Sequence, residues 1–125
     1  MRPTRIERLS EEFREEIAMI IHRELKDPHL GFVTITGVEL SSDLRHAKVA
    51  FSCLGNEQDR LRSQEVLDRS ARYIYGLLKK RFRLKAIPEL VFRHDDSIAG
   101  AIAISETLDH IKEQSPGGSS SRATE

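Results

Sequence analysis

The order of apolar periodicities along the chain is the feature that most limits its fold. A stretch with helical spacing (4–26) precedes two stretches in which apolar and polar residues alternate (32–40 and 47–53). A second helical stretch (58–83) and a third alternating one (89–94) follow. Because helices and strands are mixed and do not follow a strict βαβ alternation, this order favours an α+β sandwich, with helices on one face of a three-stranded sheet.

Local signals predict where these elements end. Asp27-Pro28 should end the first helix, because a residue before proline disfavours the helical conformation. Gly37 interrupts the first alternating stretch, which predicts a β-bulge. Asp95-Asp96-Ser97 predicts a turn whose serine caps a last, short helical segment. Adjacent carboxylates before a serine are more typical of such a turn than of acid–base catalysis, the alternative.

Composition predicts a single soluble domain. The 125 residues suit one domain at 1–114, followed by a tail at 115–125 that is rich in Gly and Ser and is expected to be disordered. No apolar run approaches the roughly 20 residues that span a bilayer, and the charged N-terminus does not resemble a signal peptide. The lone Cys53 cannot form an internal disulfide, so a cytoplasmic location is expected.

Enzyme and metal motifs are absent from the sequence. The five histidines are scattered without ligand spacing, and no phosphate loop, dinucleotide fingerprint or catalytic elbow occurs. We therefore expect no catalytic residues, no metal and no cofactor.

Positive charge is concentrated in one segment, 69–85. Its seventeen residues include seven cations and no acid, whereas the chain as a whole has 20 basic and 20 acidic residues. Outside the segment, 13 basic residues face 20 acidic ones, so the chain is polarised although its net charge is zero. Concentrated charge of one sign steers a partner of the opposite sign, which for a soluble protein is most often nucleic acid.

Helical geometry divides the segment into two faces. One face is apolar and should face the core: Leu67, Ala71, Ile74, Leu78 and Phe82. The other is basic: Arg69, Arg72, Lys79, Lys80 and Arg83. Gly76 lies in the middle of the basic face, where it either leaves a gap for a phosphate or sugar or is simply a tolerated surface glycine. Arg81 and Lys85 project away from this face and are weaker RNA-binding candidates.

The alternative to nucleic-acid contact is a solvated helix face. Such a face usually mixes charges in i,i+4 pairs, and an acid-free face repels itself without that support. Nucleic-acid contact is therefore favoured, mainly to phosphates, which provides affinity and salt dependence but little base specificity. Tyr73 and Tyr75 flank the face and could stack on bases, although partial burial is the favoured role for both.

The element order α-β-β-α-β is that of a type II KH domain, a module that clamps single-stranded RNA with a GxxG loop. No GxxG occurs in this chain. The order, combined with several local strings, resembles the ribosome-binding factor A family over residues 2–112. The matching strings are IHRELKDP (21–28), VTITGVELSSDL (33–44), AKV (47–49), RFRLKAIPELVF (81–92) and DS (96–97).

The resemblance implies a KH-like domain without the GxxG loop that assists ribosome assembly and is not an enzyme. It implies binding to the free small (30S) ribosomal subunit and its rRNA, and help in late maturation of 16S rRNA, including the helix at its 5′ end. It further implies importance for growth in the cold, a functional link to a maturation GTPase, no membrane contact and a monomeric state.

One position departs from the family pattern. The family interrupts its second helix at an Ala-x-Gly sequence, and the matching residues here are Ser70, Ala71 and Arg72. An arginine therefore stands where the family has glycine. The kink could be milder, could fall on Arg72 in an unfavourable backbone conformation, or could be replaced by a bend at Ser70.

A DNA-binding module that uses the basic helix is the alternative function. It would need a helix-turn-helix partner and usually dimer symmetry. The predicted hairpin before the helix and the strand after it do not supply that arrangement.

Overall fold

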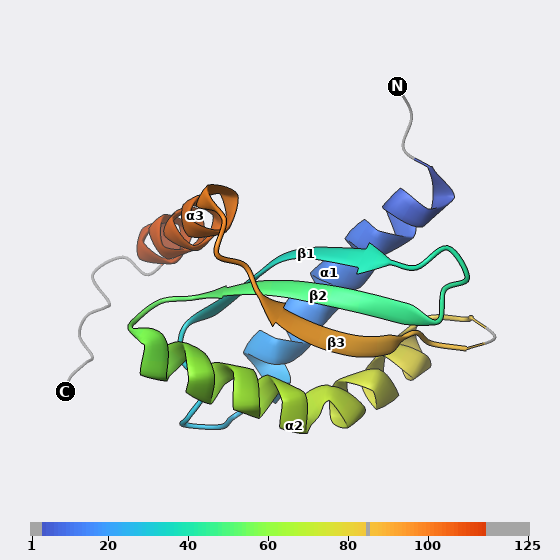
Figure 1. Ribbon diagram of the computed structural model, residues 1–125, viewed down its shortest axis with the longest axis horizontal. Helices are drawn as coiled ribbons and strands as arrows, with labels where there is room; N and C mark the ends of the chain where they lie inside the picture. Colours follow the sequence, from blue (N-terminus) through green and yellow to red (C-terminus); the bar gives the residue numbers. More distant parts are fainter. Residues whose placement is uncertain (1–3, 85, 115–125) are drawn as a thin grey trace.

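Six elements make up the computed structural model, which describes residues 4–84 and 86–114 (Figure 1). They are α1 (Arg5–Glu24), β1 (Val33–Leu40), β2 (His46–Cys53), α2 (Glu57–Arg81), β3 (Glu89–His94) and α3 (Ile98–Gln114). The predicted α+β fold and element order are confirmed. The tail at 115–125 and Lys85 lie outside the described residues.

Helix α1 begins at a reciprocal cap. The Glu7 N–H donates to Thr4 Oγ1 at 3.0 Å, and the Thr4 N–H donates to Glu7 Oε1 at 2.8 Å, which satisfies two backbone donors that a helix start leaves open. The helix ends at Glu24, before the predicted end at Lys26, because Leu25 is extended and packs partly against the core.

The predicted bulge in β1 is confirmed and has a clear consequence for packing. Ile35 pairs with Phe51 and Gly37 with Ala50, so Thr36 is the extra residue. A one-residue insertion reverses the side-chain alternation. The residues that face the core are therefore odd-numbered before the bulge (Val33 and Ile35) and even-numbered after it. Both halves of the strand thus direct side chains into the core.

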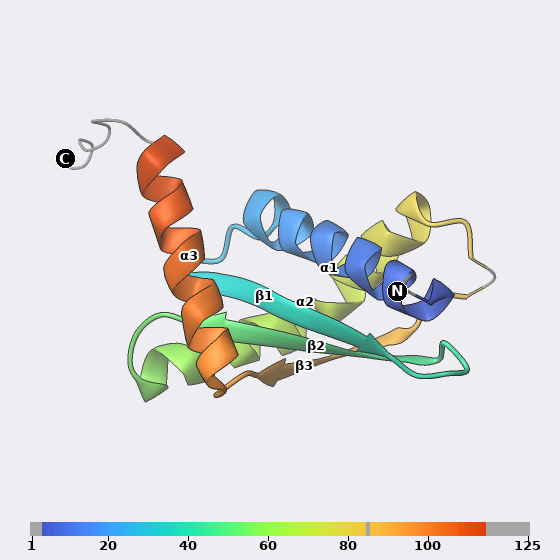
Figure 2. The ribbon, with the colours of Figure 1, turned by 90° about the horizontal axis from the view of Figure 1, so that it is seen from above.

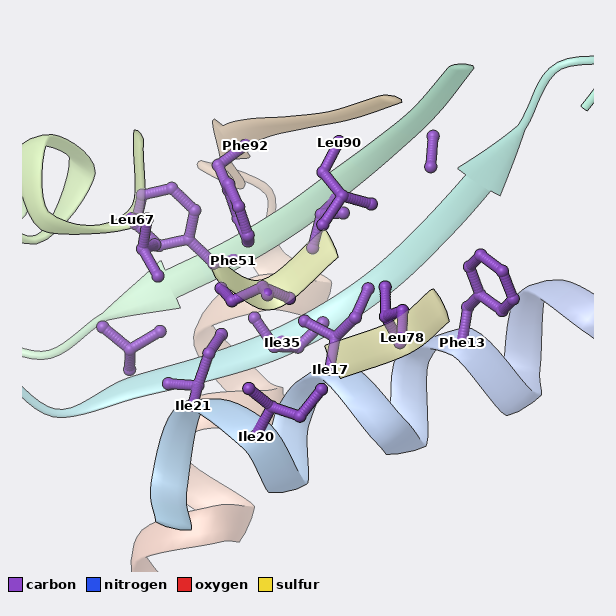
Figure 3. Close-up of a cluster of buried hydrophobic side chains, with 14 of the residues drawn as sticks. Phe13, Ile17, Ile20, Ile21, Ile35, Phe51, Leu67, Leu78, Leu90 and Phe92 are labelled. Carbon is purple, nitrogen blue, oxygen red and sulfur yellow. The ribbon is translucent and has the colours of Figure 1, made fainter. Parts of the chain in front are cut away.

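The sheet has the order β1-β2-β3, with β1 and β2 antiparallel and β2 and β3 parallel. Helix α2 connects the two parallel strands, and α1 and α2 lie on the same face of the sheet (Figure 1). Between them and the sheet is one hydrophobic core (Figure 3). Its fully buried residues include Phe13, Ile17, Val49, Phe51, Leu67, Ile74, Leu78 and Phe92.

Helix α3 covers part of the other face, beyond the two-layer arrangement that the sequence predicted. It crosses the end of the sheet where β1 begins (Figure 2). Beneath it Ser52 is buried although it faces away from the core. The backbone approaches closely there, because a Cβ added to Gly100 would lie 2.7 Å from Ser52 Oγ. The predicted cap is present, since the Gly100 N–H donates to Ser97 Oγ at 3.1 Å.

Candidate nucleic-acid interface

Helix α2 positions most of the predicted basic residues, but it ends at Arg81 and not at the predicted Arg83, so Arg83 lies just beyond the helix. The helix begins at a reciprocal cap between Asn56 and Asp59, comparable to that of α1. The predicted core face is confirmed: Leu67, Ile74 and Leu78 are fully buried, and Ala71 and Phe82 pack partly against the core. Burial of this face leaves the opposite face of α2 at the surface.

The helix is continuous where the family pattern suggested an interruption. Residues 70–72 lie within a single α-helix of 25 residues. Among the described residues, Leu44 is the one non-glycine residue with a positive φ, so Arg72 does not adopt the left-handed conformation that a glycine would tolerate. Arg72 is part of this unbroken helix, and its side chain is exposed.

Two of the predicted cations turn toward acids that follow or belong to α1. Arg69 Nη2 donates to Asp27 Oδ2 at 2.8 Å, and Arg81 Nε lies 3.2 Å from Glu16 Oε1. The His29 backbone N–H and, to a smaller extent, the Arg69 guanidinium hold the pKa of Asp27 below its ordinary value. Arg69 therefore contacts the loop after α1 and Arg81 contacts α1 itself, and both are less available to a partner.

The other four described candidates form what we term the exposed basic face: Arg72, Lys79, Lys80 and Arg83. All four are exposed, and none makes an ion pair within 4.0 Å with a residue that the structure describes. Cations that make no ion pair with a described residue keep their charge available, and an anionic partner would be attracted to it.

The space above Gly76 is open. This residue lies in the middle of the exposed basic face, and an added Cβ would meet no atom within 4 Å. Internal packing therefore does not require a glycine, although a glycine in a helix interior costs about 1 kcal/mol relative to alanine.

Gly76→Ala separates the two interpretations of this glycine. We expect the variant to raise the free energy of unfolding by about 0.5–1 kcal/mol in urea denaturation, because alanine loses less backbone entropy on folding. If a phosphate or sugar approaches the backbone here, the same variant will bind RNA more weakly than wild type. Unchanged RNA affinity in the stabilised variant would identify Gly76 as a tolerated surface glycine.

A groove lies beside the exposed basic face; we call it the α2 groove. Its cavity volume is about 1080 Å³, and it is lined by the middle of α2, the segment 84–90, the β1–β2 turn and Arg5 at the start of α1. Arg69 and Arg72 reach it from α2. Sequence reasoning missed Arg5, Arg45 and His46, which line it from other elements, because no local spacing signals a contact between remote segments.

The β1–β2 turn that forms one wall of the α2 groove is held by its own hydrogen bonds. Ser41 Oγ donates to Asp43 Oδ1 at 2.7 Å, and the Arg45 N–H donates to Asp43 Oδ1 at 3.0 Å. The Ser41 hydroxyl and then the Arg45 N–H hold the pKa of Asp43 below its ordinary value. Leu44 has a φ of 60°, an uncommon conformation for a branched residue. The turn thus holds the backbone of Arg45 in a defined position.

The two tyrosines differ in exposure and contacts. Tyr73 is half-exposed, and its hydroxyl donates to Glu24 Oε1 at 3.3 Å, so its polar end is directed to α1. Tyr75 is partly buried against the core and lines the α2 groove. The sequence favoured partial burial for both tyrosines, and Tyr75 matches that expectation better than Tyr73.

The described residues offer little for other chemistry. No group of three or more His, Cys, Asp or Glu among them is placed to hold a metal ion. Within the same part of the chain, none of the helices combines the length and apolarity needed to cross a membrane. Asp95 accepts hydrogen bonds from Thr36 Oγ1 and the Ser97 N–H, at 2.9 Å each, which matches the predicted turn and cap.

Comparison with known proteins gives a consistent result. The family model described as ribosome-binding factor A matches residues 5–108. The chain is 43% identical over 114 residues to ribosome-binding factor A of Halothermothrix orenii, covering 91% of this chain and 93% of that protein. The solution structure of a candidate ribosome binding factor A from Thermotoga maritima is 36% identical, with a TM-score of 0.69 over 78% of this chain and 94% of that one.

A second similar set of coordinates comes from a complex. A homology model of ribosome binding factor A of Thermus thermophilus, fitted into an electron cryo-microscopy map of a 30S–RbfA complex, is 26% identical to this chain. Its TM-score is 0.59, and the match covers 70% of this chain and 92% of that one.

Proposed function

The chain belongs to the ribosome-binding factor A family, and from that membership we propose that it binds the free small (30S) ribosomal subunit through its exposed basic face. The observation that most supports this role is that Arg72, Lys79, Lys80 and Arg83 are exposed without an ion pair to any described residue. Such a surface suits the phosphates of ribosomal RNA.

The proposal extends to the consequence of binding. The protein would assist late maturation of 16S rRNA, including the helix at its 5′ end, and leave with the help of a maturation GTPase. It would act in the cytoplasm as a monomer, without catalysis, by stabilising one arrangement of the RNA. A protein that binds one conformation preferentially shifts the population toward it without breaking a covalent bond.

Deletion of the gene tests this role. We expect precursor 16S rRNA and free small subunits to accumulate, most strongly in the cold, where misfolded RNA rearranges slowly. Northern blots of rRNA ends and sucrose-gradient profiles measure both effects, and reintroduction of the wild-type gene is the control. Normal rRNA ends and normal profiles in the cold would refute the proposal.

A binding experiment distinguishes this role from DNA binding. Purified protein should sediment with free small subunits, whereas duplex DNA at the same salt concentration should bind only weakly and without sequence preference. Tight, sequence-dependent binding to duplex DNA would instead support a DNA-binding module.

A further inference from the structure

Strand β1 forms one edge of the sheet, with no neighbouring strand on its outer side among the described residues (Figure 1). The Ser41 N–H donates to the His46 carbonyl oxygen, and bonded pairs alternate with non-bonded pairs along an antiparallel ladder. Val38 and Leu40 therefore turn their backbone N–H and C=O groups away from β2. Within the part of the chain that the structure describes, these outward groups have no hydrogen-bond partner.

A groove runs along this edge, and we call it the β1 groove. Its cavity volume is about 410 Å³, and five consecutive strand residues, 36–40, line one side of it. Successive side chains of a strand point to opposite faces, so a groove that touches all five follows the backbone edge. The other side is the first half of α1, where Ile6, Ser10 and Arg14 lie on one face of the helix.

A strand edge beside a helix is suited to an extended peptide. Such a peptide joins the sheet as an additional strand, its main chain bonds to the edge, and its alternate side chains enter neighbouring pockets. The bulge at Thr36 disrupts the ladder, which limits the regular edge to the residues after it. At about 3.3 Å per residue, a segment of about five residues matches the part of β1 that lines the groove.

The charge of the β1 groove selects its occupant. The lining includes three carboxylates, Glu7, Glu11 and Glu39, and one cation, Arg14, which forms an ion pair with Glu11. Glu39 also lies 3.8 Å from Lys48, but both side chains are exposed and such a pair contributes little. The excess of negative charge repels an RNA backbone. A second copy of the chain is disfavoured too, because pairing of two β1 strands would bring the same carboxylates together.

We propose that the β1 groove binds an extended segment of a partner protein in which lysine or arginine residues alternate with apolar ones. Residues aligned on neighbouring strands share a face of the sheet. The apolar side chains of the segment therefore lie beside Val38 and Leu40, near Ile6 of α1, and the basic ones lie on the face of Glu39.

This site is separate from the exposed basic face, because α1 contacts β1 at one edge of the sheet, whereas α2 contacts β3 at the other. The inference goes beyond the proposed function, since the partner is a protein and not RNA.

An NMR titration of the full chain, labelled with nitrogen-15, tests the proposal. The probe is the peptide acetyl-Lys-Val-Lys-Val-Lys-Val-amide at about 1 mM, which detects weak specific binding. We expect the amide signals of Val38 and Leu40 to shift and that of Leu90, at the opposite edge of the sheet, to stay unshifted. The same peptide with glutamate in place of lysine should leave all three signals unchanged.

Two methylated peptides test whether the main chain pairs with β1. One carries N-methyl groups on its valines and the other on its lysines, so composition and charge are equal. A strand turns alternate amides toward its neighbour, so one of these peptides should bind like the parent and the other should lose binding. Equal affinity of the two would mean that the peptide does not form a strand beside β1.

A charge reversal and a matched control complete the test. Glu39→Lys should weaken binding of the lysine–valine peptide by about threefold or more, because an exposed attraction becomes a repulsion. Glu65→Lys makes the same change at an exposed position of α2 outside the β1 groove and should bind like wild type. Both positions are exposed, so neither change should prevent folding.

The remaining outcomes identify other occupants or none. No shift at Val38 and Leu40 would overturn the proposal. Shifts of these signals on raising the protein concentration alone would assign the edge to a second copy, and shifts with single-stranded RNA but not with the peptide would assign it to RNA. Each of these results leaves the proposed function untouched, because sedimentation with small subunits is measured separately.

Discussion

Replacement of Lys79, Lys80 and Arg83 by glutamate is expected to weaken binding to free small subunits by about 100-fold or more. Each change removes an attraction to phosphate and adds a repulsion, and misplaced like charges cost several kcal/mol, at about 1.4 kcal/mol per tenfold. The slope of log K against log salt should fall by about one per lost contact. Sedimentation or fluorescence anisotropy over a series of salt concentrations measures both quantities.

The fold should tolerate this variant, because all three side chains are exposed and make no ion pair within 4.0 Å with a described residue. Surface changes of this kind usually alter the free energy of unfolding by less than about 0.5 kcal/mol. The matched control replaces Arg8, Arg23 and Lys48 by glutamate, which changes the net charge equally at exposed positions outside α2. If both variants bind equally weakly, net charge and not the exposed basic face governs the affinity.

Phe51→Ala is expected to lower the free energy of unfolding by about 3–5 kcal/mol, the range for truncation of a buried phenylalanine. Phe51 is fully buried in the central strand, and its ring meets the His94 ring edge-on with centroids 5.5 Å apart. The loss is a large part of the ~5–15 kcal/mol that stabilises a typical domain. Urea denaturation followed by circular dichroism measures it.

Leu61→Ala is the control for the truncation, because Leu61 is an apolar residue of α2 that is 56% exposed. Its substitution should change the free energy of unfolding by less than about 0.5 kcal/mol. A Phe51→Ala variant no less stable than Leu61→Ala would mean that the core beneath β2 can close around the missing ring.

Much of the fold could be predicted because its signals are local. The stripe of Phe13, Ile17 and Ile20 repeats at helical spacing and is buried as expected. Gly37 marked the bulge, and Ser97 marked the cap of α3. In each case the information lies within a few residues, where backbone preference and side-chain spacing act directly.

The selection among the predicted cations could not be made in the same way. Arg69 and Arg72 are close in the sequence and both lie on the predicted basic face, yet Arg69 is bound to Asp27 and Arg72 makes no ion pair with a described residue. Asp27 is 42 positions away in the chain. The distance between Asp27 and Arg69 depends on how α1 packs beside α2. A helical projection of α2 alone does not include that information.

The course of α2 also needed the folded chain. Of the three possibilities that the family pattern left at 70–72, the structure excludes an unfavourable backbone conformation at Arg72, because the helix is unbroken there and Ile74 and Leu78 are buried in the core on the following turns. Burial of that face favours a regular helix. Arg72 is exposed at the surface of α2, beside the α2 groove.

Local periodicity and turn chemistry are sufficient to specify the elements of this protein, their order, the core face of α2 and the resemblance to its family, since each depends on neighbours along the chain. Three features emerge only when the elements pack together: the division of the cations into paired and exposed ones, the α2 groove, and the position of α3 on the second face of the sheet. All three depend on distances between residues far apart in sequence, and packing of the core sets those distances.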